Sequence, residues 1–240
     1  MAPAGYGDKV EGIHAVTAAL AAGRVKRLYV ERSRRGRMGS VLEALEAPTV
    51  EFVDDVRPIA DTDSPQGVVA LCRPITPATL ESLAGEDAAV LVLDHLEDPH
   101  NVGASARSAL AAGVGGMVVS SRRAAPLSST AFKAAAGALE RLAVAVVGSI
   151  PEALSRLKDH GVWVVGLEPG GDQTLFGLDL LSEPVAVVVG AEGSGLAELT
   201  RKRCDVLASI PMATDTESLN ASVSAALASF EIMRVRSRPR

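Results

Sequence analysis

The spacing of apolar positions divides the chain into two parts. The first part predicts, in order, helix 12–22, strand 27–30, helix 39–45, strand 50–53 and strand 67–72. A segment with two prolines and no periodicity follows, Arg73-Pro-Ile-Thr-Pro-Ala-Thr, and runs into a short helix before Gly85. We therefore expect a small α/β domain over residues 1–73, a linker over 74–86 and a second domain over 87–240.

The second part alternates between strand and helix patterns. The expected strands are 88–93, 116–120, 144–147, 162–167, 185–189 and 206–210. The expected helices are 102–112, 129–138, 151–160, 196–203 and 219–236. Strands such as Val185-Ala-Val-Val-Val189 are apolar at every position, which is typical of a parallel sheet that helices cover on both faces. The pattern therefore predicts the α/β fold class.

The last expected helix carries an apolar stripe at helical spacing. Its members are Leu219, Val223, Leu227, Phe230 and Met233. Such a stripe fits packing into the core, and near the end of the chain it also fits a contact between subunits. Both explanations are kept at this point.

Charge and composition restrict how the chain could bind a polyanion. The formal net charge of −5 argues against a general nucleic-acid binder, and an aromatic content of 3% disfavours base stacking on exposed rings. Any nucleic-acid contact would therefore be local. The candidate is a basic cluster in the first domain: Arg24, Lys26, Arg27, Arg32, Arg34, Arg35 and Arg37. The same residues would also fit an ordinary solvated surface, as would the smaller basic groups at 201–203 and 234–240.

Cysteines and histidines give no sign of a metal or disulfide site. Cys72 and Cys204 are far apart and form no C-x-x-C pattern, so we expect small core residues. The four histidines, His14, His95, His100 and His160, lack the spacing of metal ligands. The N-terminus has no basic segment leading into an apolar one, and no apolar run approaches about 18 residues. We expect a soluble cytoplasmic protein that needs no metal.

Three polar loops follow expected strands, where ligands of parallel sheets bind. They are Asn101-Val-Gly103 with Arg107, Gly190-Ala-Glu192-Gly-Ser-Gly195, and Ser218-Leu-Asn220. Each alone fits an ordinary helix start, with Asn or Ser as a cap or an acid near the helix dipole. The glycine spacing is not the G-x-G-x-x-G of dinucleotide folds, and the strand 206–210 does not end in an acid for a ribose, which disfavours a nucleotide-dependent oxidoreductase.

The three loops together favour one ligand site over three independent caps. Each carries a polar group that a simple turn does not need: Asn101 with Arg107, then Glu192, then Ser218 with Asn220. The guanidinium of Arg107 could bind a phosphate through two parallel hydrogen bonds.

These residues resemble the SpoU/TrmH branch of the SPOUT RNA methyltransferases. Asp98-Pro-His-Asn101-x-Gly-x-x-x-Arg107 resembles the first motif of that family, Val189 to Gly195 the second, and Ile210-Pro-Met212 through Ser218-Leu-Asn220-x-Ser222 the third. Gly12-Ile-His-Ala-Val16 and Gln66-Gly-Val-Val-Ala70 resemble the substrate-recognition domain of the ribosomal RNA branch. Ser64-Pro65 departs from that branch, in which His often precedes the Gln-Gly pair.

The resemblance implies a Rossmann-like catalytic domain with a deep C-terminal trefoil knot, a homodimer, and S-adenosylmethionine as the methyl donor. Its implied cofactor contacts are Gly166, Leu167, Gly190, Ile210, Met212, Leu219 and Asn220. Arg107 would be the catalytic residue, assisted by Asn101, Glu192, Ser218 and Asn220. The implied reaction methylates a ribose 2′-hydroxyl, foremost of a guanosine in 23S ribosomal RNA. The alternatives are the same chemistry on transfer RNA or on an antibiotic-protective ribosomal site, and a catalytically silent RNA-binding assembly factor.

Overall fold

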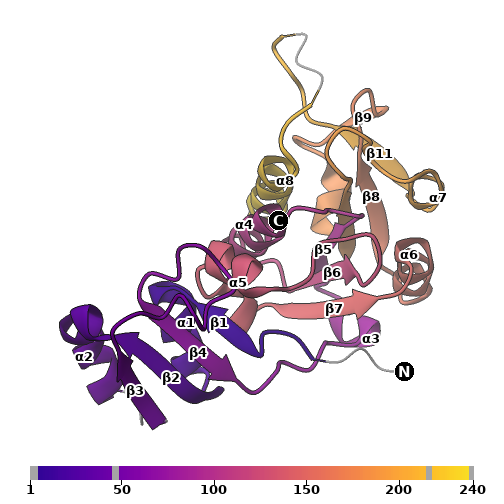
Figure 1. Ribbon diagram of the computed structural model, residues 1–240. Coiled ribbons are helices and arrows are strands. Elements are labelled where there is room, and N and C mark those ends of the chain that lie inside the picture. The colour runs from indigo at the N-terminus through magenta and orange to yellow at the C-terminus, as the bar shows by residue number, and fades with distance from the viewer. Residues whose placement is uncertain (1–4, 45–48, 215–217, 238–240) are drawn as a thin grey trace.

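The chain folds into two sheets that are joined by a short connection. The computed structural model describes residues 5–44, 49–214 and 218–237. A four-stranded sheet has the order β1-β4-β2-β3, and a seven-stranded sheet has the order β7-β6-β5-β10-β8-β11-β9. Figure 1 shows the small sheet at one end of the molecule and the large sheet at the other.

The small domain contains both parallel and antiparallel strand pairs. Its elements are β1 (Lys9–Glu11), α1 (Ile13–Ala21), β2 (Val25–Glu31), η1 (Arg32–Arg34), α2 (Arg35–Ala44), β3 (Thr49–Val53) and β4 (Val68–Cys72). β2 pairs with β3 in parallel, and β4 pairs antiparallel with β1 and β2. Sequence periodicity did not predict β1, and α2 begins at Arg35 instead of residue 39.

The large sheet is parallel throughout, as the apolar strands predicted. Its strands are β5 (Ala89–Leu93), β6 (Gly116–Ser120), β7 (Ala143–Val147), β8 (Trp163–Leu167), β9 (Gln173–Thr174), β10 (Val185–Val189) and β11 (Val206–Ser209). Its helices are α3 (Leu80–Leu83), α4 (Pro99–Ala111), α5 (Ser129–Ala135), η2 (Ala138–Glu140), α6 (Ile150–Asp159), η3 (Asp179–Ser182), α7 (Glu198–Arg201) and α8 (Ala221–Arg236). Alternate strand residues enter two separate clusters of buried side chains, one on each face of the sheet.

Helix α4 begins three residues earlier than expected. Asp98 is its N-cap, because Asp98 Oδ1 accepts a hydrogen bond of 2.8 Å from the backbone N–H of His100. Pro99 occupies the first helical turn, where a missing N–H costs nothing. The interpretation of Asn101 as a possible cap is therefore wrong. Asn101 lies inside the first turn, and its side-chain amide is available for another contact.

Helix α8 turns part of its apolar stripe away from the core. Val223, Phe230 and Met233 are exposed, so the core explanation is wrong for these three residues. The buried face consists of smaller or differently spaced residues: Ala221, Ala225, Ala228, Ile232 and Val235. None of the described helices has both the length and the apolar character that a membrane span requires.

A buried ion pair connects the two domains. The guanidinium of Arg24 donates to both carboxylate oxygens of Glu140, with Nε 2.6 Å from Oε2, and the two side chains are only 11% and 2% exposed. Arg24 also donates to the carbonyls of Gly7 and Arg73. Breaking such a pair leaves a charge inside the protein, which costs about 3–5 kcal/mol. The pair therefore fixes the small domain against η2.

Both cysteines are free thiols that the fold partly or wholly buries. Cys72 is buried on β4, and Cys204 is partly buried between α7 and β11. Burial raises the pKa of Cys72 to about 11 and that of Cys204 to about 12. Both therefore stay protonated near neutral pH, in keeping with the expected core role.

Candidate active site

Three loops that are distant in sequence meet through their side chains. Asn101 Nδ2 donates to Glu192 Oε1 at 2.6 Å, and Asn220 Nδ2 donates to the same oxygen at 2.7 Å. Asn220 Nδ2 also lies 3.2 Å from Asn101 Oδ1. These hydrogen bonds confirm that the three loops converge. We call this group, Asn101, Glu192 and Asn220, the polar triad.

Local structure fixes the orientation of each triad member. Asn220 caps α8, because its Oδ1 accepts from the backbone N–H of Ser222 at 2.8 Å and from the Ser222 hydroxyl at 2.6 Å. Its Nδ2 is thereby directed to Glu192. Glu192 lies in a tight turn that two backbone hydrogen bonds between Ala191 and Gly195 close. Asn101 is 8% exposed and is held by the first turn of α4.

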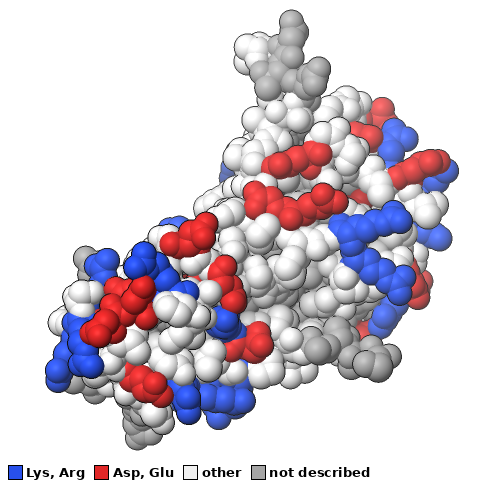
Figure 2. All heavy atoms as spheres, viewed as in Figure 1, with Lys and Arg blue, Asp and Glu red and all other residues white. Residues whose placement is uncertain are grey.

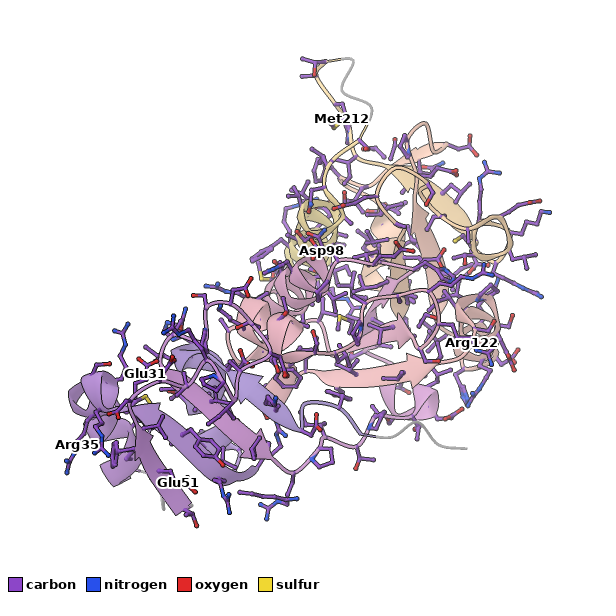
Figure 3. All side chains as sticks on the ribbon, in the orientation of Figure 1. Glu31, Arg35, Glu51, Asp98, Arg122 and Met212 are labelled. Carbon is purple, nitrogen blue, oxygen red and sulfur yellow. The ribbon has the colours of Figure 1, made fainter. Side chains whose placement is uncertain are left out.

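A cavity of about 520 Å³ opens on one side of the triad. Its walls come from the ends of β8, β10 and β11 and from the start of α8. The predicted site residues on its walls are Leu167, Gly190, Glu192, Ile210, Met212, Ser218 and Leu219. Small-molecule sites typically have 300–1,000 Å³, so the cavity can hold a nucleoside-sized ligand. Figure 3 shows Met212 on the extended segment that precedes α8.

Two predicted cofactor contacts lie outside the walls of this cavity. Gly166 is buried in β8, where an added Cβ would lie 2.7 Å from Cys204 Sγ and 2.8 Å from Leu196 Cδ1. Its lack of a side chain therefore serves the packing of the sheet. Asn220 is also not on the walls, although its neighbours Leu219 and Ala221 are.

A second cavity of about 450 Å³ lies on the other side of the triad. Its walls are Leu96, Glu97, Asp98, Asn101, Ala191, Glu192 and Ser194. Ala191 and Glu192 line both cavities, so the second of the three loops, residues 190–195, separates one cavity from the other. Two substrates that occupied the two cavities would thus meet at the polar triad.

Arg107 stands apart from the triad. It is exposed on α4, six residues after Asn101, which corresponds to about 9 Å along a helix axis. In the described part of the chain, no hydrogen bond or ion pair reaches its guanidinium. Its side chain is therefore available to an external ligand.

The basic cluster of the small domain is partly neutralised by acids. Arg27 lies 3.6 Å from Glu51, and Arg32 pairs with Asp54 at 3.1 Å. Figure 2 shows both signs of charge side by side on this domain. Arg35 stacks over the Phe52 ring at 5.1 Å from its centroid, and the side chain of Arg37 lies outside the described residues. Lys26 and Arg34 form no ion pair with a described residue.

Sequence reasoning missed a buried carboxylate beside the second cavity. Asp94 is 1% exposed; its Oδ1 lies 2.6 Å from His95 Nδ1, and its Oδ2 accepts from the backbone N–H of Ala197 at 2.9 Å. It therefore joins the loop after β5 to the loop after β10. An acid directly after a wholly apolar strand is the sequence signal that could have identified it.

Comparison with known proteins gives a consistent result. The family description SpoU rRNA Methylase family matches residues 88–230, and RNA 2'-O ribose methyltransferase substrate binding matches residues 9–78. The 23S rRNA (guanosine-2'-O-)-methyltransferase RlmB of Ralstonia nicotianae is 40% identical over 94% of this chain and 95% of its own length. A putative TrmH family tRNA/rRNA methyltransferase, YacO of Bacillus subtilis, is 36% identical over 95% of this chain and 96% of its own.

Solved structures agree with the sequence comparison over nearly the whole chain. The SpoU methyltransferase AviRb from Streptomyces viridochromogenes, in complex with AdoMet, is similar with a TM-score of 0.81 and 26% identity, covering 97% of this chain and 91% of that one. The AdoMet-bound rRNA methyltransferase from Sinorhizobium meliloti has a TM-score of 0.77 and 26% identity, covering 94% and 86%. The matched regions include all three loops and both sheets. The chain is a member of the SpoU rRNA methylase family.

Proposed function

We propose that this protein transfers the methyl group of S-adenosylmethionine to a ribose 2′-hydroxyl of RNA, with a guanosine of 23S ribosomal RNA as acceptor. The polar triad carries the proposal, because its hydrogen bonds join the three family motifs at the wall between two cavities. The relative from Ralstonia nicotianae, which matches over both domains, is named for this reaction. A silent RNA-binding factor would have no need of an intact triad.

The larger cavity fits the donor. Leu167, Gly190, Ile210, Met212 and Leu219 line it, and the glycine allows main chain to approach a ligand closely. Asn220 fixes the start of α8 at its edge. When bound, S-adenosylmethionine supplies an activated methyl group. Gly166 precedes the wall residue Leu167, and any contact of Gly166 with the donor would be made by its main chain, because its Cβ position faces Cys204 and Leu196.

The chain's own residues position the acceptor. Asn101, Glu192 and Asn220, with Ser218, orient the ribose so that its hydroxyl points toward the donor cavity, which converts binding energy into alignment. A guanidinium group is a positive charge whose planar shape suits a phosphate. We assign to Arg107 the phosphate next to the reacting ribose and the stabilisation of negative charge that develops on the 2′-oxygen.

The RNA extends from this site to the small domain. We propose Lys26, Arg27, Arg32, Arg34, Arg35 and Arg37 as its phosphate contacts there. Arg24 is excluded, because its guanidinium is occupied by Glu140 inside the protein. We further propose a cytoplasmic homodimer whose interface includes the exposed face of α8.

A methyl-transfer assay tests the proposal. Wild-type protein with labelled S-adenosylmethionine should label 23S ribosomal RNA from cells that lack this modification, and should not label transfer RNA. Arg107→Ala should lower the rate roughly 10²- to 10³-fold, in line with the loss of one charge-stabilising donor. Donor binding, measured by calorimetry, should stay unchanged.

Arg141→Ala is the matched control for Arg107→Ala. Arg141 is also exposed and forms no hydrogen bond or ion pair with a described residue, but it precedes β7, at the opposite edge of the sheet. The control should retain wild-type activity. Full activity in Arg107→Ala would remove the assigned role, and labelling of transfer RNA alone would replace the acceptor.

A further inference from the structure

The described arginines of the catalytic domain divide into those that its own acids or carbonyls engage and those that they leave unpaired. Ion pairs neutralise its other basic residues in most cases: Arg156 with Glu81, Lys158 with Asp205, Arg201 with Glu168, Lys202 with Glu198 and Arg234 with Glu231. Arg236 donates to backbone carbonyls. In the described part of this domain, Arg107, Arg122, Arg123, Arg141 and Arg203 have neither an ion pair nor a side-chain hydrogen bond.

Two of these arginines are adjacent and lie at the active-site edge of the sheet. Arg122 and Arg123 are exposed in the loop that follows β6. β6 is the neighbour of β5, and Leu93 pairs with Val119, so this loop leaves the sheet at the same level as the loop that carries Asp98. The pair does not belong to any of the three longer basic runs of the chain, at 24–37, 201–203 and 234–240.

The loop is held in place by bonds on both sides. Ser120 Oγ donates to the carbonyl of Arg122 at 2.8 Å and accepts from its N–H at 3.1 Å. The N–H of Ala125 donates to the carbonyl of Leu96 at 2.7 Å, which ties the loop to the wall of the second cavity. Arg123 has a φ of 49°, which is a left-handed conformation that is unfavourable for residues other than glycine. The two guanidinium groups therefore start from a fixed main chain.

Charge at the site explains why RNA needs such a contact. The net charge of the chain is −5, and Glu97, Asp98 and Glu192 line the second cavity. These acids repel phosphates, so the RNA backbone must be attracted on either side of the reacting nucleotide. Figure 2 shows a group of blue side chains beside the red ones near the centre of the catalytic domain. In Figure 3, Asp98 lies between the small domain, with Arg35, and Arg122 on the other side.

We propose that Arg122 and Arg123 form a phosphate-binding site for the substrate RNA, on the side of the acceptor nucleotide that faces away from the small domain. The inference rests on the proposed function. The loop after β10 carries Glu192, and β10 lies two strands away from β6. At about 4.8 Å per strand spacing, the starts of the two loops are about 10 Å apart. At about 3.4 Å per stacked nucleotide, the contacted phosphate lies roughly three nucleotides from the methylated ribose.

The test compares two double variants in binding to unmodified 23S ribosomal RNA over a range of salt concentrations. Arg122→Gln with Arg123→Gln removes the proposed site. Arg141→Gln with Arg203→Gln removes the same charge from two exposed, unpaired arginines. They precede β7 and β11 and therefore lie at the amino ends of the strands, opposite the active site. Each phosphate contact contributes about 0.7–0.9 to the slope of log K against log salt. The first variant should therefore lose roughly 1.4–1.8 units of slope.

If the variant and the wild type bind RNA equally at 1 M salt, this difference in slope makes the variant bind about 25- to 60-fold more weakly at 0.1 M salt. The KM for RNA should rise by a similar factor, while calorimetric donor affinity and the melting temperature stay at wild-type values. An unchanged slope in the first variant, or an equal loss in the control variant, would overturn the site. Failure of the proposed function looks different: wild-type protein would transfer no methyl group, whereas the binding difference between the two variants would persist.

Discussion

At the scale of single residues, Glu192 organises the active site. One carboxylate oxygen accepts both side-chain amides, and each amide comes from a different loop. Since an amide nitrogen only donates, these bonds determine which way both Asn101 and Asn220 are turned. The carbonyl of Asn101 then faces the Asn220 amide. The triad is thus oriented without any contribution from a ligand.

Replacing Glu192 tests this organisation. Glu192→Ala removes the common acceptor and should lower the free energy of unfolding by about 1–2 kcal/mol, because two amide donors lose a charge-assisted bond. Methyl transfer should fall more than tenfold. Glu192→Gln keeps an oxygen that can accept from both amides, so it should retain most of the stability in urea unfolding experiments. An alanine variant as stable as wild type would show that the bonds do not hold the loops.

At the scale of elements, the sequence was sufficient for apolar strands of four or more residues and for the longer helices. All six strands expected in the second domain formed, because their short apolar runs, rich in valine and bounded by turn residues, suit strands that are buried on both faces. β1 and β9 were missed, since segments of three and two residues show no period. The start of α4 was misplaced because Asp98 and Pro99 form a cap ahead of the first apolar residue. The trefoil knot stays a prediction, as do the domain limits.

The sequence predicted the members of the triad, but not the shape of the site around them. Residue types and order predicted that Asn101, Glu192 and Asn220 would meet, whereas the division into two cavities depends on how the turn around Glu192 packs. The roles of Arg24 and Gly166 could not be predicted. Glu140 lies more than a hundred residues from Arg24, and the neighbours of Gly166 come from another strand and a loop. Local pattern carries no information on such partners.

The turn after β10 offers a prediction at this scale. A Cβ on Gly190 would fall on the main chain of Gly195, so Gly190→Ala must open the turn that forms the cavity wall. Calorimetry should show at least tenfold weaker S-adenosylmethionine binding, and stability should drop by about 1–3 kcal/mol.

Gly148→Ala serves as the control for the glycine substitution. Gly148 follows β7 at the same edge of the sheet, has no atom within 4 Å of an added Cβ, and does not have a positive φ. It should keep wild-type donor binding. Equal donor affinity in Gly190→Ala would mean that this turn is not part of the donor site.

At the scale of the whole molecule, the exposed face of α8 supports the proposed homodimer. Val223, Phe230 and Met233 are 45%, 44% and 39% exposed. Aromatic and methionine side chains are enriched in subunit interfaces. We expect wild-type protein to sediment at twice the mass of the chain. Phe230→Asp should sediment at the mass of one chain, because a carboxylate would be buried without a partner.

Leu199→Asp provides the comparison for the interface. Leu199 is 66% exposed on α7, away from α8, and should leave the sedimentation of the protein unchanged. A monomeric wild-type protein at micromolar concentration, or a Phe230→Asp variant that remains dimeric, would contradict the assigned interface.

The Arg24–Glu140 pair has a consequence for how a target is chosen. Because the two charges hold the domains together from inside, they restrain the separation between the proposed RNA contacts of the small domain and the triad. In the proposed function, the enzyme would hold its RNA contacts at a set distance from its active site. It would select a nucleotide by its distance from a folded RNA feature, and lengthening the intervening RNA helix by one base pair should move or abolish the mark.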